Sequence, residues 1–177
     1  MGFLRKCFAG RKKLFWLSAG LVLLADQLSK SLLWHLPEAG REPVVLIPHV
    51  LQVIGHGGNP GGALGLPGSP LLYGVAALVG LALIAFFFAT TGPGEGLVHC
   101  GLGLLAGGAM GNLIDRVNLG FVRDFIDLHW KDAFHWYTFN VADAAICLGF
   151  GIILFGYLFS GERSPHPEEE EASERYG

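Results

Sequence analysis

Charged residues are scarce in this chain: aspartate, glutamate, lysine and arginine make up 15% of its 177 residues, and hydrophobic residues make up 51%. Soluble domains carry about 25% charged residues, so the composition argues against an ordinary soluble domain. The length leaves room for one domain of usual size. The net charge of -3 comes largely from the acidic run Glu168 to Glu171, which is typical of a solvated tail, and it gives no reason to expect a nucleic-acid partner.

Cysteine is also rare. The three cysteines, Cys7, Cys100 and Cys147, are far apart in the chain. Scattered cysteines have neither the spacing of a zinc site nor that of a disulfide framework. We therefore expect small buried hydrophobic residues at these positions, and neither a metal ion nor a cofactor in the protein.

Two hydrolase motifs are absent. The chain has no His-Glu-x-x-His sequence, which zinc proteases use, and no Gly-x-Ser-x-Gly sequence. Ser29 precedes Lys30, but adjacent residues on a helix do not face each other, so a Ser-Lys pair is not favoured. His129 and His135 are interpreted as polar residues of a membrane-surface loop, not as metal ligands.

Four apolar runs are present. They cover about residues 14–33, 71–90, 98–114 and 141–159, and about 20 apolar residues are enough to cross a bilayer as a helix. Five basic residues precede the first run, which predicts a cytoplasmic N-terminus. Four crossings return the C-terminus to the cytoplasm. The prediction is an all-α membrane protein with a single domain, residues 1–160, and a disordered acidic cytoplasmic tail, residues 161–177.

Between the first two runs the sequence changes character. Residues 43–68 are rich in proline and glycine, and they include the β-branched segments Val44 to Ile47 and Val50 to Ile54. Short segments of this kind, bounded by turn residues, are typical of strands. We expect a small extra-membrane β-sheet here, on the outer side of the membrane.

Small residues recur at helical spacing in the last two runs. Gly103, Gly107 and Gly111 lie four residues apart, and Ala145 and Gly149 form a matching pair. Such stripes let membrane helices approach each other closely. They predict helices that pack through small faces.

Three aspartates lie near the outer ends of the predicted spans. Asp115 follows the third span, Asp143 lies in the first turn of the fourth, and Asp124 lies between them. An ionisable group in hydrocarbon costs about 3 kcal/mol or more, so such residues are usually functional. Two carboxylates that share a site hold one proton between them, which is the arrangement of aspartic proteases.

Two further hypotheses remain open from the residues alone. Asp26, Lys30, Asp115 and Asp143 are also the residues that a small proton- or cation-coupled transporter would use. A non-catalytic scaffold that pairs through its glycine stripes is the other hypothesis. Asp26 and Lys30 are four residues apart, and they suit either a self-neutralising interfacial pair or a direct role in the site.

Five short motifs together narrow the choice. They are Asp26-Gln-x-Ser-Lys30, Asn59-x-Gly-Gly-Ala63, Gly111-Asn112-x-x-Asp115-Arg116, Val122-x-Asp124-Phe125-Ile126 and Phe139-Asn140-x-Ala142-Asp143. In this order and spacing they resemble the bacterial lipoprotein signal peptidases (signal peptidase II, or prolipoprotein signal peptidase). The resemblance runs from the first span to the fourth. It departs from the family at Leu64 and Gly65, where an aromatic residue and then a serine are common.

The resemblance implies an aspartic endopeptidase of the inner membrane, which cuts the signal peptide from a prolipoprotein just before its diacylglyceryl-modified cysteine. It implies catalytic roles for Asp124 and Asp143, and a substrate cradle built from residues 43–68 and part of the loop before Asn140. The implied substrate-binding or supporting residues are Asp26, Lys30, Asn59, Gly61, Asn112, Asp115, Arg116, Asn140 and Ala142. We expect a monomer whose partners are the prolipoprotein and membrane lipids.

Overall fold

The computed structural model describes residues 2–36, 42–55, 58–59, 69–92, 95–131 and 133–159, and for 2–11, 58–59, 70 and 159 it describes the backbone only. The predicted tail lies outside the described residues. The helices are α1 (Gly2–Leu33), α2 (Pro70–Thr90), α3 (Gly96–Leu119) and α4 (Val141–Phe159). The strands are β1 (Val44–Ile47), β2 (Leu51–Val53), β3 (Gly58–Asn59), β4 (Val122–Arg123), β5 (Ile126–Trp130) and β6 (Phe134–His135).

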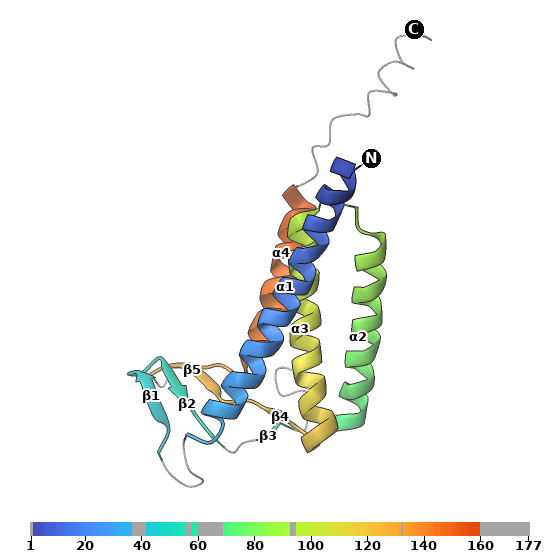
Figure 1. Ribbon diagram of the computed structural model, residues 1–177. Coiled ribbons are helices and arrows are strands. Elements are labelled where there is room, and N and C mark those ends of the chain that lie inside the picture. The colour runs from blue at the N-terminus through green and yellow to red at the C-terminus, as the bar shows by residue number, and fades with distance from the viewer. Residues whose placement is uncertain are drawn as a thin grey trace.

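Among the described residues, three helices are long and apolar enough to cross a bilayer: Leu71–Thr90, Gly96–Leu119 and Val141–Leu158. They correspond to the second, third and fourth predicted spans. The first predicted span lies inside α1, where Asp26 and Lys30 interrupt the apolar run. In Figure 1 α1 runs along the whole bundle beside α3 and α4.

The third helix is longer than predicted. The expected end was residue 114, but α3 continues to Leu119 and ends at Gly120, whose φ of 79° is left-handed. Glycine adopts this conformation without steric cost and commonly ends helices in this way. Asp115 and Arg116 therefore lie inside the last turns of α3, not beyond its end.

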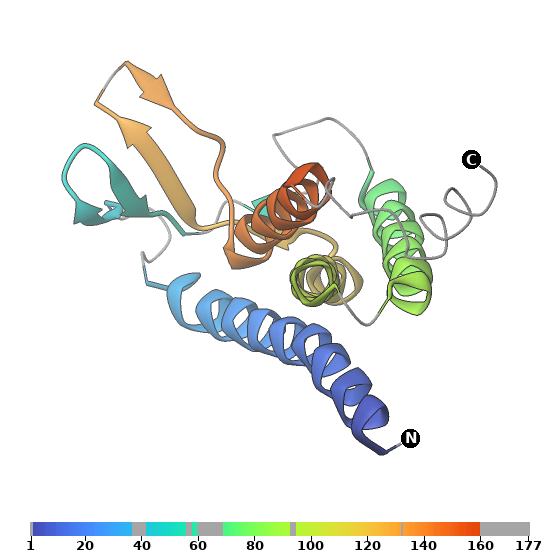
Figure 2. The same ribbon diagram turned by 90° about the horizontal axis from the view of Figure 1, so that it is seen from above.

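The glycines of α3 explain why it occupies the centre of the bundle in Figure 2. A Cβ atom at Gly103 or Gly107 would meet the backbone of α1, around Phe15 and Ala19. The predicted stripe therefore packs against α1. The partner of Gly149 on α4 is instead Gly101, because a Cβ on either residue would meet the other's carbonyl oxygen at 2.7–2.9 Å.

The apolar surface of the bundle faces outward, as lipid contact requires. Exposed side chains on α2 and α4 include Leu78, Phe86, Phe150 and Phe155. Cys147 is exposed on α4 and Cys100 is half-buried on α3, so the expectation that the cysteines are buried is wrong for Cys147. In a membrane protein an apolar side chain can face lipid, and burial inside the protein is not required of it.

The predicted sheet is present, and it joins strands from residues 43–68 to strands from the loop before Asn140, as the resemblance implies. Its strand order is β1-β2-β5-β6, with all three pairs antiparallel. The pair β3-β4 is separate, and it aligns Asn59 with Val122. The sheet lies at the end of the bundle where α1 ends and α4 begins, opposite the N-terminus of α1 (Figure 1). The connection that carries Asp124 therefore continues directly from β4 into the four-stranded sheet.

Candidate active site

The site begins with the first turn of α4. The side-chain oxygen of Asn140 accepts a hydrogen bond from the backbone N–H of Asp143 at 3.0 Å, and the carboxylate of Asp143 accepts one from the backbone N–H of Asn140 at 3.3 Å. This reciprocal pair is a capping box, which satisfies helix N–H groups that have no partner inside the helix. Helix capping thus fixes the position of Asp143.

Asn140 also contacts the second predicted catalytic carboxylate. Its side-chain nitrogen donates to Oδ1 of Asp124 at 2.7 Å. Asp124 lies between β4 and β5 and is buried, with 3% of its surface exposed. One amide side chain therefore joins Asp124, from the extra-membrane connection, to Asp143, from the helix.

Asn112 connects α3 to this group. Its side-chain nitrogen donates to Oδ1 of Asp143 at 2.8 Å. Its side-chain oxygen accepts from Asn140 at 3.1 Å and from the ammonium of Lys30 at 2.9 Å. Asp143 thus receives hydrogen bonds from both α3 and the start of α4.

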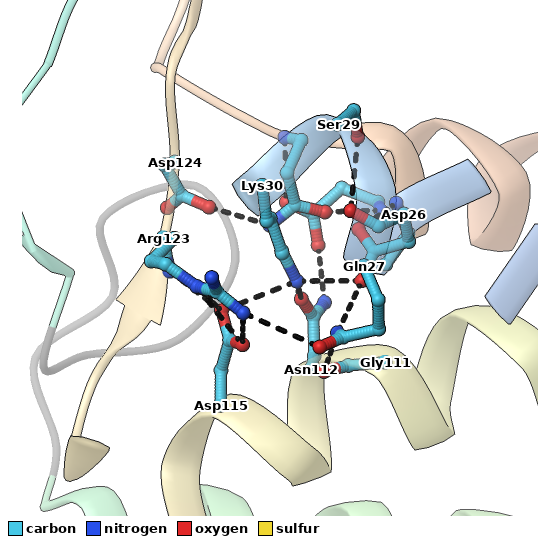
Figure 3. Close-up of polar contacts among 12 residues, drawn as sticks. Asp26, Gln27, Ser29, Lys30, Gly111, Asn112, Asp115, Arg123 and Asp124 are labelled. Atoms are coloured by element: carbon cyan, nitrogen blue, oxygen red, sulfur yellow. Dashed lines mark hydrogen bonds and ion pairs between the residues drawn. The ribbon is translucent and has the colours of Figure 1, made fainter. Parts of the chain in front are cut away.

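Two residues of α1 complete the cluster, shown in Figure 3. Lys30 and Asp26 form an ion pair at 2.8 Å, and both side chains are fully buried. The second oxygen of Asp26 accepts from the backbone N–H of Ala142 at 3.0 Å, so α1 caps the start of α4. Gly111 makes this approach possible, because a Cβ there would collide with the carboxylate of Asp26. The pair therefore belongs to the buried cluster.

Asp115 has a different set of partners. The guanidinium of Arg123 pairs with its Oδ1 at 2.6 Å, the backbone N–H of Arg123 donates to its Oδ2 at 2.9 Å, and Lys30 lies 3.4 Å away. Asp115 thereby ties α3 to the strand that precedes Asp124. Arg116, although adjacent in sequence, donates to the carbonyl of Asn112 at 3.3 Å and lies over the ring of Tyr73.

The remaining predicted site residues are less fully described. Asn59 lies on β3, with its backbone beside Val122 of β4, two residues before Asp124. Gly61, Leu64 and Gly65 lie outside the described residues. The contribution of Ala142 is its backbone N–H, and its side chain is fully buried.

Sequence reasoning missed Arg123 and Gln27. Arg123 pairs with Asp115 through Nη2, and the same nitrogen donates to the side-chain oxygen of Gln27 at 3.3 Å. Gln27 in turn donates to the carbonyl of Gly111 at 3.2 Å. One signal could have identified Arg123. A buried carboxylate such as Asp115 needs a cation as partner. Arg116 is adjacent to Asp115 on the helix and does not face it, so the partner had to be another basic residue.

The described part of the chain has no candidate metal site. No group of three histidine, cysteine, aspartate or glutamate side chains there is placed to hold an ion. His129 and His135 instead contact the carboxylate of Asp127, at 3.5 and 2.9 Å. His129 lies on β5 and His135 lies on β6 of the sheet.

The arrangement suits general acid-base chemistry. Asp124 and Asp143 accept hydrogen bonds from neutral amides, whereas Asp115 is bound to two cations and is held as a charged structural group. The carboxylates of α1, α3 and α4 gather with Lys30 at one end of the bundle, whereas Lys12 and Lys13 near the start of α1 and His99 near the start of α3 lie towards the other end. A relay of protons or cations would need such groups at successive depths, so the transporter hypothesis gains no support.

Comparison with known proteins agrees with the resemblance of the motifs to signal peptidase II. The family model described as signal peptidase (SPase) II matches residues 18–159. A lipoprotein signal peptidase of Syntrophotalea carbinolica is 35% identical over 155 residues, which cover 85% of this chain and 94% of the relative. A lipoprotein signal peptidase of Methylocella silvestris is 41% identical over 150 residues, which cover 81% and 85%.

Solved structures show the same similarity. A bacterial membrane enzyme structure determined by the in meso method at 2.3 Å resolution matches with a TM-score of 0.75 and 29% identity, over 86% of this chain and 92% of that chain. A second, at 1.9 Å, matches with a TM-score of 0.70 and 31% identity. Since the family model extends from the apolar part of α1 to the end of α4, this chain belongs to signal peptidase II, family A8 of the aspartic peptidases.

Proposed function

We propose that the protein removes signal peptides from prolipoproteins and cuts just before the diacylglyceryl-modified cysteine, with Asp124 and Asp143 as the catalytic pair. Relatives named lipoprotein signal peptidase that match most of the chain support this activity. The single observation that carries the assignment of residues is that Asn140 donates to both carboxylates, from its side-chain nitrogen to Asp124 and from its backbone N–H to Asp143.

The reaction needs one proton on the pair. The charged carboxylate takes a proton from water while the protonated one donates a hydrogen bond to the scissile carbonyl oxygen. Water adds to the carbonyl carbon as the protonated carboxyl passes its proton to the carbonyl oxygen, which gives a tetrahedral diol and leaves one proton on the pair. The C–N bond then breaks as the nitrogen takes that proton and a hydroxyl of the diol returns one to the pair. The products are a carboxylic acid, which ionises in water, and the free amine of the cysteine.

The supporting roles follow from the contacts. Asn112 and Asn140 orient the carboxylates, Asp26 and Ala142 hold the start of α4, and Asp115 with Arg123 holds the connection. Arg116 stabilises the last turns of α3 beside them. Asn59, beside β4, belongs to the proposed cradle edge, and Gly61 is proposed as a substrate-binding residue.

The proposed orientation places both termini in the cytoplasm and the site at the periplasmic face of the inner membrane. Five basic residues before the first apolar run support this. The cluster lies at the end of the bundle opposite the N-terminus of α1 (Figure 1). The substrate's cysteine, lipidated at the outer surface, would then meet the carboxylates at interfacial depth. We propose a monomer surrounded by membrane lipids.

The test uses purified protein in detergent with a precursor peptide that carries a diacylglyceryl-modified cysteine, and the same peptide without lipid as the control. Mass spectrometry of the products should show one cut, just before the modified cysteine, and no cut in the control. Equal cleavage of both peptides would contradict the proposed specificity, and no cleavage of either would contradict the activity.

A further inference from the structure

Lys30 is a buried cation surrounded by oxygens. Its ammonium has three N–H groups, and three oxygens surround it: Asp26 at 2.8 Å, Asn112 at 2.9 Å and Asp115 at 3.4 Å. The side chain has no exposed surface. Lys30 is therefore enclosed by protein oxygens and has no exposed surface for a substrate, so any effect it has on the reaction passes through these neighbours.

The neighbour that leads to the carboxylates is Asn112. An ammonium can only donate, so the group that Asn112 turns toward Lys30 is its oxygen. The other end of the same amide, its NH₂ group, then faces Asp143 at 2.8 Å. Reversing the amide would place N–H groups against the ammonium and an oxygen against a carboxylate.

A second donor acts on the same oxygen, but more weakly. Asn140 donates to Oδ1 of Asn112 at 3.1 Å, between two neutral amides. Hydrogen bonds from a charged donor are roughly twice as strong as neutral ones. Of the two donors to this oxygen, Lys30 is thus the stronger influence on the orientation and the polarisation of Asn112.

We propose that Lys30 is a positioning residue of the reaction: its ammonium fixes the amide of Asn112 so that Asn112 presents an N–H donor to Asp143. This inference rests on the proposed function, which makes Asp143 one of the catalytic pair. The substrate does not contact Lys30, so Lys30 affects turnover and not substrate affinity.

The competing explanation is that Lys30 only neutralises Asp26 inside the bundle. The substitution Lys30→Met alone cannot separate the two, because it leaves the carboxylate of Asp26 buried without its cation, which destabilises strongly. The exchange Asp26→Asn with Lys30→Met removes both charges together. The oxygen of an asparagine can still accept from the N–H of Ala142, and Asp115 keeps Arg123.

The experiment compares four proteins in detergent: wild type, Asp26→Asn, Asp26→Asn with Lys30→Met, and Asp26→Asn with Lys30→Gln. The last pair is matched in charge and similar in length, and only glutamine supplies a neutral donor to Asn112. Melting temperature, kcat and KM are measured for each with the lipid-modified peptide.

We expect both double variants to melt within about 5 °C of wild type, because a neutral buried pair often replaces an ionic one without loss of stability. The Met variant should lose about tenfold or more in kcat, and its KM should change by less than about threefold. The Gln variant should recover about threefold of that kcat and stay below about a third of wild type, because its donor carries no charge.

A folded Met variant with kcat near that of wild type would overturn the proposal and make Lys30 a counter-ion only. Equal kcat for folded Met and Gln variants, or a loss confined to KM, would also contradict it. If the Met variant does not fold, the Gln variant decides: kcat below about a third of wild type supports the proposal, and wild-type kcat contradicts it. Failure of the proposed function is a separate result, in which wild type itself does not cut.

Discussion

Asn140 and Asp143 hold each other at the first turn of α4, each accepting a hydrogen bond from the other's backbone N–H, at 3.0 and 3.3 Å. The same contacts that start the helix thus orient a carboxylate of the proposed catalytic pair. Because the remaining N–H groups of Asn140 point to Asp124 and Asn112, its capping role and its role in the site can be separated by mutation.

Asn140→Ser should preserve the cap of α4 and remove the hydrogen bond to Asp124. Serine is as good an N-cap as asparagine, whereas alanine costs about 1 kcal/mol. Serine has no amide nitrogen to reach Asp124. We expect the Ser variant to melt close to wild type and to lose about tenfold or more in turnover, whereas Asn140→Ala loses both stability and turnover. A Ser variant with wild-type turnover would show that the bond to Asp124 has no catalytic role.

Gly111→Ala should disrupt the contact between α1 and α3. The added Cβ would meet the carboxylate of Asp26, and overpacking of this kind costs about 1–3 kcal/mol. Gly151→Ala on α4 is the matched control, because nothing lies within 4 Å of its Cβ position. Melting temperatures in detergent check the prediction, and equal values for the two variants would contradict it.

Asp115→Asn should act mainly on stability. Asp115 pairs with Arg123 and Lys30, and removing one partner from a buried ion pair costs about 3–5 kcal/mol. We expect a clear fall in melting temperature. The double variant with Arg123→Met should regain part of the loss, because it no longer leaves the guanidinium unpaired. A double variant less stable than Asp115→Asn would contradict the assigned pairing.

The proposed orientation predicts where fused reporters lie. A reporter after Gly177 and one within residues 91–96 should report the cytoplasm, and one near Lys131 should report the periplasm, because the basic residues before the first apolar run stay inside. A cytoplasmic signal at Lys131, which follows β5, would place the cluster on the wrong face.

Much of this architecture could be predicted because hydrophobic length and periodicity are local properties. The runs 71–90 and 141–159 match α2 and α4 within one residue, and Val44 to Ile47 is a strand. The predicted end of α3, residue 114, was wrong because residues 115–119 are polar enough to resemble a loop. They continue the helix as far as Gly120.

The neighbours of each residue were harder to predict. The stripe that includes Gly103 and Gly107 indicates a close contact but does not say which helix makes it, and the partner is α1. Likewise, nothing in the spacing of Asp26 and Ala142, 116 residues apart, indicates that one caps the other. Such contacts depend on how the helices are arranged, which local sequence patterns do not encode.

The most direct test of the account is the turnover of Asp124→Asn and Asp143→Asn on the lipid-modified peptide, with Asp115→Asn alongside. An amide can neither take a proton from water nor return one, and such steps contribute a factor of about 10² to 10⁴ each. Both variants should be folded and lose at least about a hundredfold in turnover, and the double variant should be little worse, since the two groups act as a unit. If Asp124→Asn retains roughly a tenth of wild-type turnover or more while a folded Asp115→Asn retains none, Asp115 is the partner of Asp143 and the central claim is wrong.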